Sequence, residues 1–144
     1  VGSMGHASSI AMGVALGKPS KHVYCFDGDG AMLMHMGSVP QIGTRDIPNF
    51  KHILFNNESH DSVGGQPTVA GSIDIPAIVK ACGYKYVATA TTFEEIEREM
   101  EIIKNTEGPV FLEIKCKRGT RSDLGRPKET PKKNKEKFIQ FLDQ

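Results

Sequence analysis

The sequence predicts an α/β protein with three layers, in which helices cover both faces of a mainly parallel β-sheet. Four short apolar runs rich in β-branched and aromatic residues recur along the chain, and segments with helical signals lie between them. Strands that alternate with helices favour parallel pairing through crossover connections. With 144 residues, the chain has the length of one domain that can bury a core of its own.

The chain opens with a predicted helix at residues 7–16, ASSIAMGVAL, whose small apolar residues suit tight packing and whose stop is Gly17. Residues 22–26, HVYCF, predict a buried strand that leads directly into a pair of glycines. A short helix is predicted next. Ser38 would cap it, and Pro40 would fall in its first turn.

A second strand, KHILF at 51–55, precedes a long loop. Residues 58–72 are rich in Gly, Ser, His and Pro and have no helical period, which indicates a functional loop. A helix over 74–82 follows and ends at Gly83, and YKYVAT at 84–89 predicts the third strand.

The last helix of the sheet region has a strong start signal. Thr92 and Glu95 have the spacing of a capping box, and an apolar stripe follows them. The fourth strand covers 110–116. The tail at 118–144 differs, because it has no apolar period until a closing helix that Thr130 would cap.

Composition argues against several classes of function. A net charge of +1 gives no reason to expect nucleic acid or a membrane surface as a partner, and no apolar run is long enough to span a bilayer. No secretion signal opens the sequence, so we expect a cytoplasmic protein. The three cysteines are widely spaced and predict reduced thiols, and Cys25 and Cys116 fall in apolar strands and are expected in the core.

Two polar motifs follow the first two strands, DGDG at 27–30 and NN at 56–57. In parallel α/β sheets, ligands bind beyond the carboxyl ends of the strands. A dinucleotide fingerprint would need a glycine where Leu33 stands, a calcium loop would need an oxygen ligand where Ala31 stands, and the Gly-Lys-Ser/Thr of a phosphate-binding loop is absent.

The interpretation that remains is a magnesium–diphosphate site. Asp29 supplies a carboxylate, and an asparagine amide supplies a neutral oxygen, both of which suit Mg²⁺. Gly28 and Gly30 let the backbone come close to phosphate oxygens. The structural alternative is a tight turn that Asp29 caps with its side chain.

Gly28-Asp29-Gly30 followed by Asn56-Asn57 resembles the signature of thiamine diphosphate enzymes. The resemblance implies the thiamine diphosphate-binding fold, with thiamine diphosphate and Mg²⁺ as cofactors. It implies that the side chains of Asp29 and Asn57 and the backbone carbonyl of Ser59 bind Mg²⁺. The start of the helix after Gly30, at Ala31, would hold the diphosphate.

Gly2-Ser3-Met4 resembles the segment that holds the aminopyrimidine ring in the same enzymes. The resemblance implies that the Gly2 carbonyl accepts a hydrogen bond from the 4′-amino group. Met4 would press the cofactor into its bent conformation. Met4 as an ordinary core residue is the alternative.

Longer stretches, among them HDSVGGQPT at 60–68 and SDLGRP at 122–127, resemble phosphonopyruvate decarboxylases. This narrower resemblance implies decarboxylation of 3-phosphonopyruvate to phosphonoacetaldehyde and CO₂ in phosphonate biosynthesis. Sulfopyruvate decarboxylase or another 2-oxo acid decarboxylase is the main alternative. A regulatory subunit that binds the cofactor without chemistry is a third.

Candidate residues for the substrate follow from the same resemblance. His60 and Asp61 come directly after the metal motif, where His60 would orient the carboxylate or the developing alkoxide, or else bond only within its loop. Arg121, directly before the SDLGRP stretch, and Arg126, within it, are candidates for the phosphonate, because guanidinium binds such groups with two hydrogen bonds. Ordinary exposed arginines are the alternative.

The resemblance covers residues 1–144 as a diphosphate- and Mg²⁺-binding domain only. The glutamate that activates the cofactor in these enzymes belongs to a pyrimidine-binding domain, which no region of this sequence matches. We therefore expect a pyrimidine-binding domain or subunit as partner, a homo- or hetero-oligomer, and no turnover by these residues alone.

Overall fold

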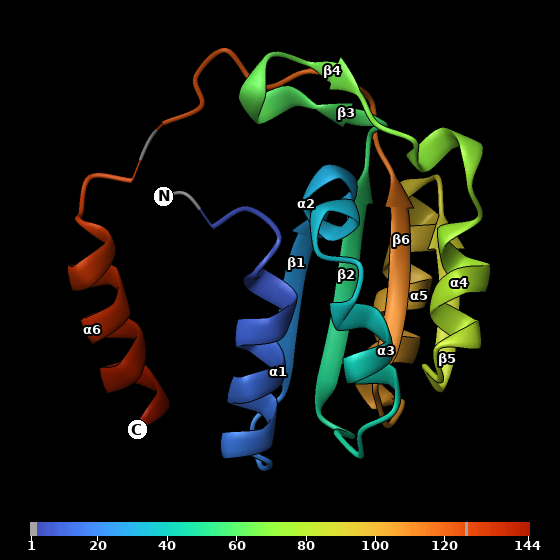
Figure 1. Ribbon diagram of the computed structural model, residues 1–144. Coiled ribbons are helices and arrows are strands. Elements are labelled where there is room, and N and C mark those ends of the chain that lie inside the picture. Colours follow the sequence, from blue (N-terminus) through green and yellow to red (C-terminus); the bar gives the residue numbers. More distant parts are fainter. Residues whose placement is uncertain (1–2, 126) are drawn as a thin grey trace.

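A computed structural model describes residues 3–125 and 127–144 of the chain. Its centre is a four-stranded parallel sheet in the order β1-β2-β6-β5 (Figure 1). The strands are β1 (Val23–Gly28), β2 (Phe50–Asn56), β5 (Tyr86–Ala90) and β6 (Val110–Lys115). The helices are α1 (Ala7–Gly17), α2 (Asp29–Met34), α3 (Ser38–Gly43), α4 (Ile75–Ala81), α5 (Phe93–Asn105) and α6 (Pro131–Leu142).

The helices form two layers on the sheet, which confirms the predicted three-layer α/β class. Helices α1 to α4 supply residues to one core cluster and α5 to the other (Figure 1). Successive residues of a strand point to opposite faces. On β6, Phe111 therefore packs in the first cluster while Leu112 packs in the second, and Leu54 and Ile53 of β2 divide in the same way.

The sequence located every strand of this sheet to within two residues, and it was wrong about one cap. Ser38 was expected to cap a helix with its hydroxyl, but α3 begins at Ser38 itself and its N-cap residue is Gly37. The Ser38 hydroxyl instead lies 3.0 Å from the Ser8 hydroxyl of α1, in a buried contact between the two helices. A serine that can bond a neighbouring helix does not need to bond its own.

The long loop predicted over 58–72 carries a small antiparallel hairpin, formed by β3 (Ser59–His60) and β4 (Gln66–Pro67). A short 3₁₀ turn (Asp61–Val63) joins these two strands, and a second one (Ala70–Ser72) follows them. The hairpin lies above the carboxyl end of the sheet (Figure 1).

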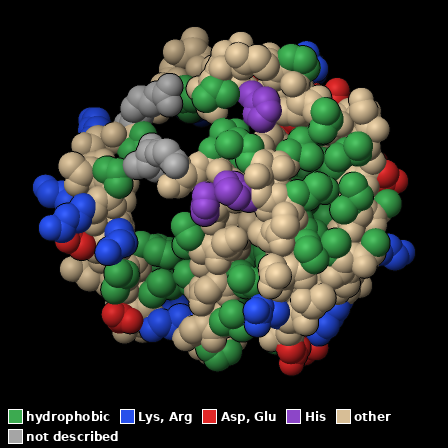
Figure 2. Space-filling view, in the orientation of Figure 1, with side chains coloured by type: hydrophobic (Ala, Val, Ile, Leu, Met, Phe, Trp, Pro, Cys, Tyr) green, Lys and Arg blue, Asp and Glu red, His purple; other side chains and the backbone are tan. Residues whose placement is uncertain are grey.

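The two strongest predicted caps are present. Thr92 accepts a hydrogen bond from the Glu95 amide while the Glu95 carboxylate accepts from the Thr92 amide, which confirms the capping box of α5. Thr130 caps α6 by accepting from the Lys133 amide. Helix α6 stands beside α1 rather than on the sheet, and its exposed lysines are visible at the left of Figure 2.

Within the residues that the structure describes, no helix combines the length and the apolar character that a membrane span requires.

Candidate functional site

A cleft with a volume of about 420 Å³ opens at the carboxyl ends of β1, β2 and β6. The register of the sheet pairs Gly28 with Phe55, so the two polar motifs leave neighbouring strands at the same level. Nine residues predicted for the site line this cleft: Met4, Gly28, Asp29, Gly30, Ala31, Asn57, Ser59, His60 and Asp61.

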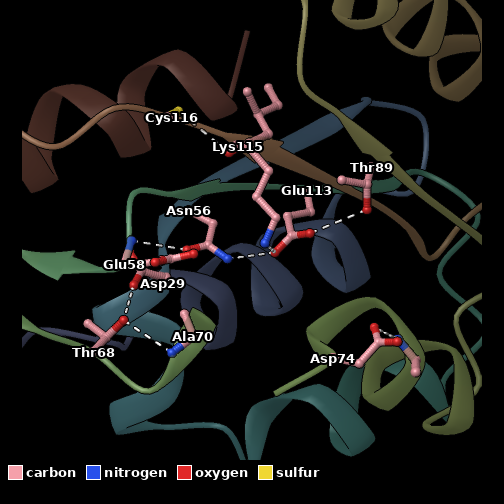
Figure 3. Close-up of polar contacts among 12 residues, drawn as sticks. Asp29, Asn56, Glu58, Thr68, Ala70, Asp74, Thr89, Glu113, Lys115 and Cys116 are labelled. Atoms are coloured by element: carbon pink, nitrogen blue, oxygen red, sulfur yellow. Dashed lines mark hydrogen bonds and ion pairs between the residues drawn. The ribbon is translucent and has the colours of Figure 1, made fainter. Parts of the chain in front are cut away.

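Asp29 is a buried carboxylate at the first position of α2. Its Oδ2 accepts a 2.5 Å hydrogen bond from the Thr68 hydroxyl, which itself accepts from the Ala70 amide (Figure 3). Among the described residues, no cation pairs with Asp29. A buried charge requires a partner, so the free lone pairs of this carboxylate suit a bound cation.

Asn57 contributes an amide whose orientation is fixed. Its Nδ2 donates to Oδ2 of Asp61 over 2.8 Å, and its Oδ1 accepts from the Ser59 amide over 3.1 Å. The amide oxygen therefore faces the turn, with a second lone pair still available. Since Asp29, Asn57 and Ser59 line one cleft with hard oxygen donors, these residues fit Mg²⁺.

The turn between Asn57 and Ser59 is unusual. Glu58 has φ 57°, in the left-handed region that side chains seldom occupy. Its carbonyl accepts from the Thr68 amide over 3.1 Å and from Nη2 of Arg118 over 3.1 Å. A strained residue held from several sides is typical of functional sites.

The Asp61 carboxylate holds this turn together through hydrogen bonds. Its carboxylate accepts hydrogen bonds from Asn57, from the Ser59 hydroxyl over 2.7 Å and from the Gly119 amide over 2.8 Å. The Ser59 hydroxyl and the Gly119 amide, followed by the nearby Arg118 and by Asn57, hold the pKa of Asp61 below its ordinary range.

Gly30 and His60 are in direct contact across the cleft. A methyl group added at Gly30 would overlap the imidazole ring of His60. At Gly28, in contrast, an added methyl group would meet no atom within 4 Å. Gly30 therefore leaves the space that the imidazole ring of His60 occupies, a reason that the sequence did not reveal.

The predicted pyrimidine segment is described only in part. Met4 is half-buried and lines the cleft, whereas Ser3 is exposed and its carbonyl accepts from the His6 amide over 3.3 Å. Gly2 lies outside the described residues.

Of the two arginines predicted for the substrate, Arg121 is described and does not line the cleft. Arg121 pairs with Asp123 at 3.1 Å, and both side chains are about three-quarters exposed. Arg126 lies outside the described residues. The cation that lines the cleft is Lys117, which the sequence analysis did not single out although it follows the fourth predicted strand.

Cysteine placement differs from expectation at one position. Cys116 was expected in the core, but it lies one residue beyond β6, is exposed and lines the cleft. Cys25 is buried as predicted, and burial together with the Asp27 carboxylate raises the pKa of its thiol to about 12. It therefore stays a neutral thiol inside the core.

Comparison with known families gives one match over most of the chain. The family described as "Thiamine pyrophosphate enzyme, C-terminal TPP binding domain" matches residues 1–114. Phosphonopyruvate decarboxylase from Streptomyces viridochromogenes is 37% identical over 142 residues, which are 99% of this chain and 36% of that protein. Sulfopyruvate decarboxylase subunit beta from Methanocaldococcus jannaschii is 38% identical over 108 residues, covering 74% of this chain and 56% of that subunit.

Solved structures agree on the fold. A putative thiamin diphosphate-dependent enzyme from Mycobacterium smegmatis superimposes with a TM-score of 0.68 at 21% identity, over 82% of this chain and 23% of that one. As for the curated relatives, the chain spans about a third of the length of the phosphonopyruvate decarboxylase that it matches.

Proposed function

Because the chain belongs to the thiamine pyrophosphate enzymes, as their C-terminal cofactor-binding domain, we propose that it is the diphosphate- and Mg²⁺-binding part of a phosphonopyruvate decarboxylase. The observation that carries this proposal is the single cleft that Asp29, Asn57 and Ser59 line together. The substrate would be 3-phosphonopyruvate, and the products phosphonoacetaldehyde and CO₂, in phosphonate biosynthesis.

The predicted residues have separate roles in this proposal. Asp29, Asn57 and the Ser59 carbonyl would hold Mg²⁺, and Gly28, Gly30 and Ala31 would leave room for the diphosphate. Met4 would hold the pyrimidine from the side of the cleft, together with Gly2 and Ser3. Thiamine diphosphate, the same compound as thiamine pyrophosphate, supplies the carbon nucleophile and the electron sink for decarboxylation.

The chain's own polar groups would handle the substrate. His60 lies over Gly30 and lines the cleft, so it is placed to donate a hydrogen bond to the substrate's carboxylate or to a developing alkoxide. Asp61 holds the loop that carries this histidine. Lys117 lines the cleft and is a candidate to bind the phosphonate, and Arg121 and Arg126 are further candidates.

Substituting Lys117 tests the choice of substrate. Lys117→Ala should raise KM for phosphonopyruvate far more than KM for pyruvate, because only the first substrate carries a second anionic group. The matched control is Lys128→Ala in the tail, which should change neither value. Equal effects of Lys117→Ala on both substrates would remove Lys117 from the substrate site.

Sulfopyruvate decarboxylation is the second candidate, since a sulfopyruvate decarboxylase subunit beta is 38% identical to this chain over 108 residues. The name of that relative identifies one subunit of a larger enzyme. We propose that this chain likewise works with a pyrimidine-binding domain or subunit, in a homo- or hetero-oligomer.

We infer a cytoplasmic location, because the three cysteines are all free.

One assay separates these proposals. The complete protein, assembled with its pyrimidine-binding part, is supplied with phosphonopyruvate, sulfopyruvate and pyruvate, and CO₂ release is measured. Phosphonopyruvate should give the highest kcat/KM, and the present 144 residues alone should give none. A preference for sulfopyruvate would support the second candidate, and cofactor binding without any turnover would indicate a regulatory subunit.

A further inference from the structure

We propose that Glu113 is a positioning residue for the metal-binding turn and that it acts through the side-chain amide of Asn56. This inference rests on the proposed function. Glu113 lies on β6, is buried and does not line the cleft, so it would not touch the metal or the cofactor.

The Glu113 carboxylate is held by three donors from three different positions of the sheet (Figure 3). Its Oε1 accepts from Nδ2 of Asn56 over 2.7 Å and from Nζ of Lys115 over 3.0 Å. Its Oε2 accepts from the Thr89 hydroxyl over 3.3 Å. A buried carboxylate with these partners has little freedom to move, so it is a rigid anchor.

Asn56 transmits this rigidity to the turn. Its side chain is buried at the end of β2, and the bond to Glu113 fixes which end of the amide is nitrogen. The amide oxygen is then turned toward the Glu58 amide, from which it accepts over 3.1 Å. This bond helps to keep Glu58 in the left-handed conformation that lets the chain reverse between Asn57 and Ser59.

The side chains of the two asparagines are therefore held by the same pattern of hydrogen bonds. Asp61 holds Nδ2 of Asn57, Glu113 holds Nδ2 of Asn56, and each amide oxygen accepts from the backbone amide two residues later. Without Glu113, the Asn56 amide would be free to rotate, and the turn that presents the Asn57 oxygen and the Ser59 carbonyl would loosen. Loss of such an outer partner typically lowers metal affinity by about 10–100-fold.

Glu113→Met tests the proposal, because methionine has a similar volume but accepts no strong hydrogen bond. Glu99→Met is the matched control, since Glu99 is another buried carboxylate. It lies on α5, which covers the other face of the sheet, and it accepts a hydrogen bond from the Tyr86 hydroxyl over 2.6 Å. Calorimetry on the complete, assembled protein measures thiamine diphosphate binding over a series of Mg²⁺ concentrations.

The Mg²⁺ concentration at half-saturation should rise about tenfold or more for Glu113→Met and stay near the wild-type value for Glu99→Met. Glu113→Gln should recover part of the loss, because its amide oxygen can still accept from Asn56. Equal midpoints for Glu113→Met and Glu99→Met would overturn the inference.

A double substitution tests the route through Asn56. Asn56→Ala should raise the midpoint as Glu113→Met does, and combining the two should add little more. Additive losses would show that Glu113 acts by another route and would contradict the proposal. If Glu113→Met fails to fold, Asn56→Ala removes the same bond from its other end, together with the bond from the Glu58 amide, so an unchanged midpoint in Asn56→Ala would overturn the inference.

The outcome for the wild type separates this inference from the proposed function. A wild type that takes up no cofactor with Mg²⁺ would overturn both. A wild type that binds, with Glu113 variants that bind equally well, would overturn the role of Glu113 alone.

Discussion

Gly30 shows how one missing side chain shapes the cleft. The sequence singled out this glycine because backbone amides must approach phosphate oxygens, and the structure adds the ring of His60, which occupies the space where a Cβ atom would stand. A glycine at this position therefore serves two neighbours at once, the expected diphosphate and the histidine.

Gly30→Ala should weaken thiamine diphosphate binding on the order of tenfold, because the added methyl group would push His60 out of its place. Binding is measured by calorimetry at saturating Mg²⁺. Gly13→Ala in α1 is the control, since a methyl group there meets nothing within 4 Å. It should leave binding unchanged and stabilise the fold by about 0.5–1 kcal/mol. Identical affinities for the two variants would refute the role of Gly30.

Asp61 gives a prediction about pH. Its hydrogen bonds to Ser59 and Gly119 hold its pKa low, so the folded state favours the charged form more than the unfolded state does. The stability that this group contributes is fully present above the ordinary pKa of aspartate. It is lost as the pH falls through the lowered pKa of the folded state.

The difference in free energy of unfolding between wild type and Asp61→Asn should therefore be constant from neutral pH down to the ordinary aspartate range, and should shrink below it. Urea unfolding at a series of pH values measures this difference. Asp46→Asn is the control, since the Asp46 side chain is 91% exposed and its replacement should matter little at any pH. A difference that grows as the pH falls would contradict the prediction.

Candidate site residues could be predicted from the sequence where they belong to a motif with a recognisable spacing. Residues whose importance depends on contacts with distant parts of the chain could not. Asp29 and Asn57 were singled out because their motifs follow two predicted strands, and the structure places both residues at one cleft. Thr68 and Glu113 carry no such signal, because their importance comes from partners 39 and 57 positions away in the chain. A glutamate inside the apolar run VFLEIK was the one visible hint for Glu113.

At the level of elements, β2 and β6 form the frame of the site. Their parallel register brings Leu54 beside Glu113 and Asn56 beside Lys115, so the motif at the end of β2 lies against polar side chains of β6. Apolar runs locate strands from sequence alone, but the order of strands depends on contacts between distant segments. The sequence therefore predicted the elements and could not predict that β6 lies between β2 and β5.

The helix on the far face, α5, offers a test of local structure. Thr92→Ala should lower the free energy of unfolding by about 1 kcal/mol, because it removes the acceptor of the Glu95 amide. Chemical denaturation measures the change. Thr120→Ala, at an exposed position of the tail, should have no comparable effect. If the two variants were equally stable, the capping box would not stabilise α5.

At the level of the whole molecule, we expect the domain to supply one wall of a larger active site. The chain spans only about a third of the matched phosphonopyruvate decarboxylase, and one face of the sheet near its edge strand leaves Phe26 and Phe55 exposed at 61% and 41%. The sequence resemblance implies the same expectation, since it places the glutamate that activates the cofactor in a separate pyrimidine-binding domain. We therefore expect activity only from the assembly, and we propose that the cation site belongs to this chain.

The most direct test of the account is cofactor binding as a function of Mg²⁺. Calorimetry on the assembled protein compares wild type with Asp29→Asn and with the control Asp46→Asn. We predict that wild type and Asp46→Asn take up thiamine diphosphate only when Mg²⁺ is present, and that Asp29→Asn has lost this dependence together with most of its affinity. Uptake by the wild type that is independent of Mg²⁺, or full affinity in Asp29→Asn, would contradict the claim that these side chains hold the cation.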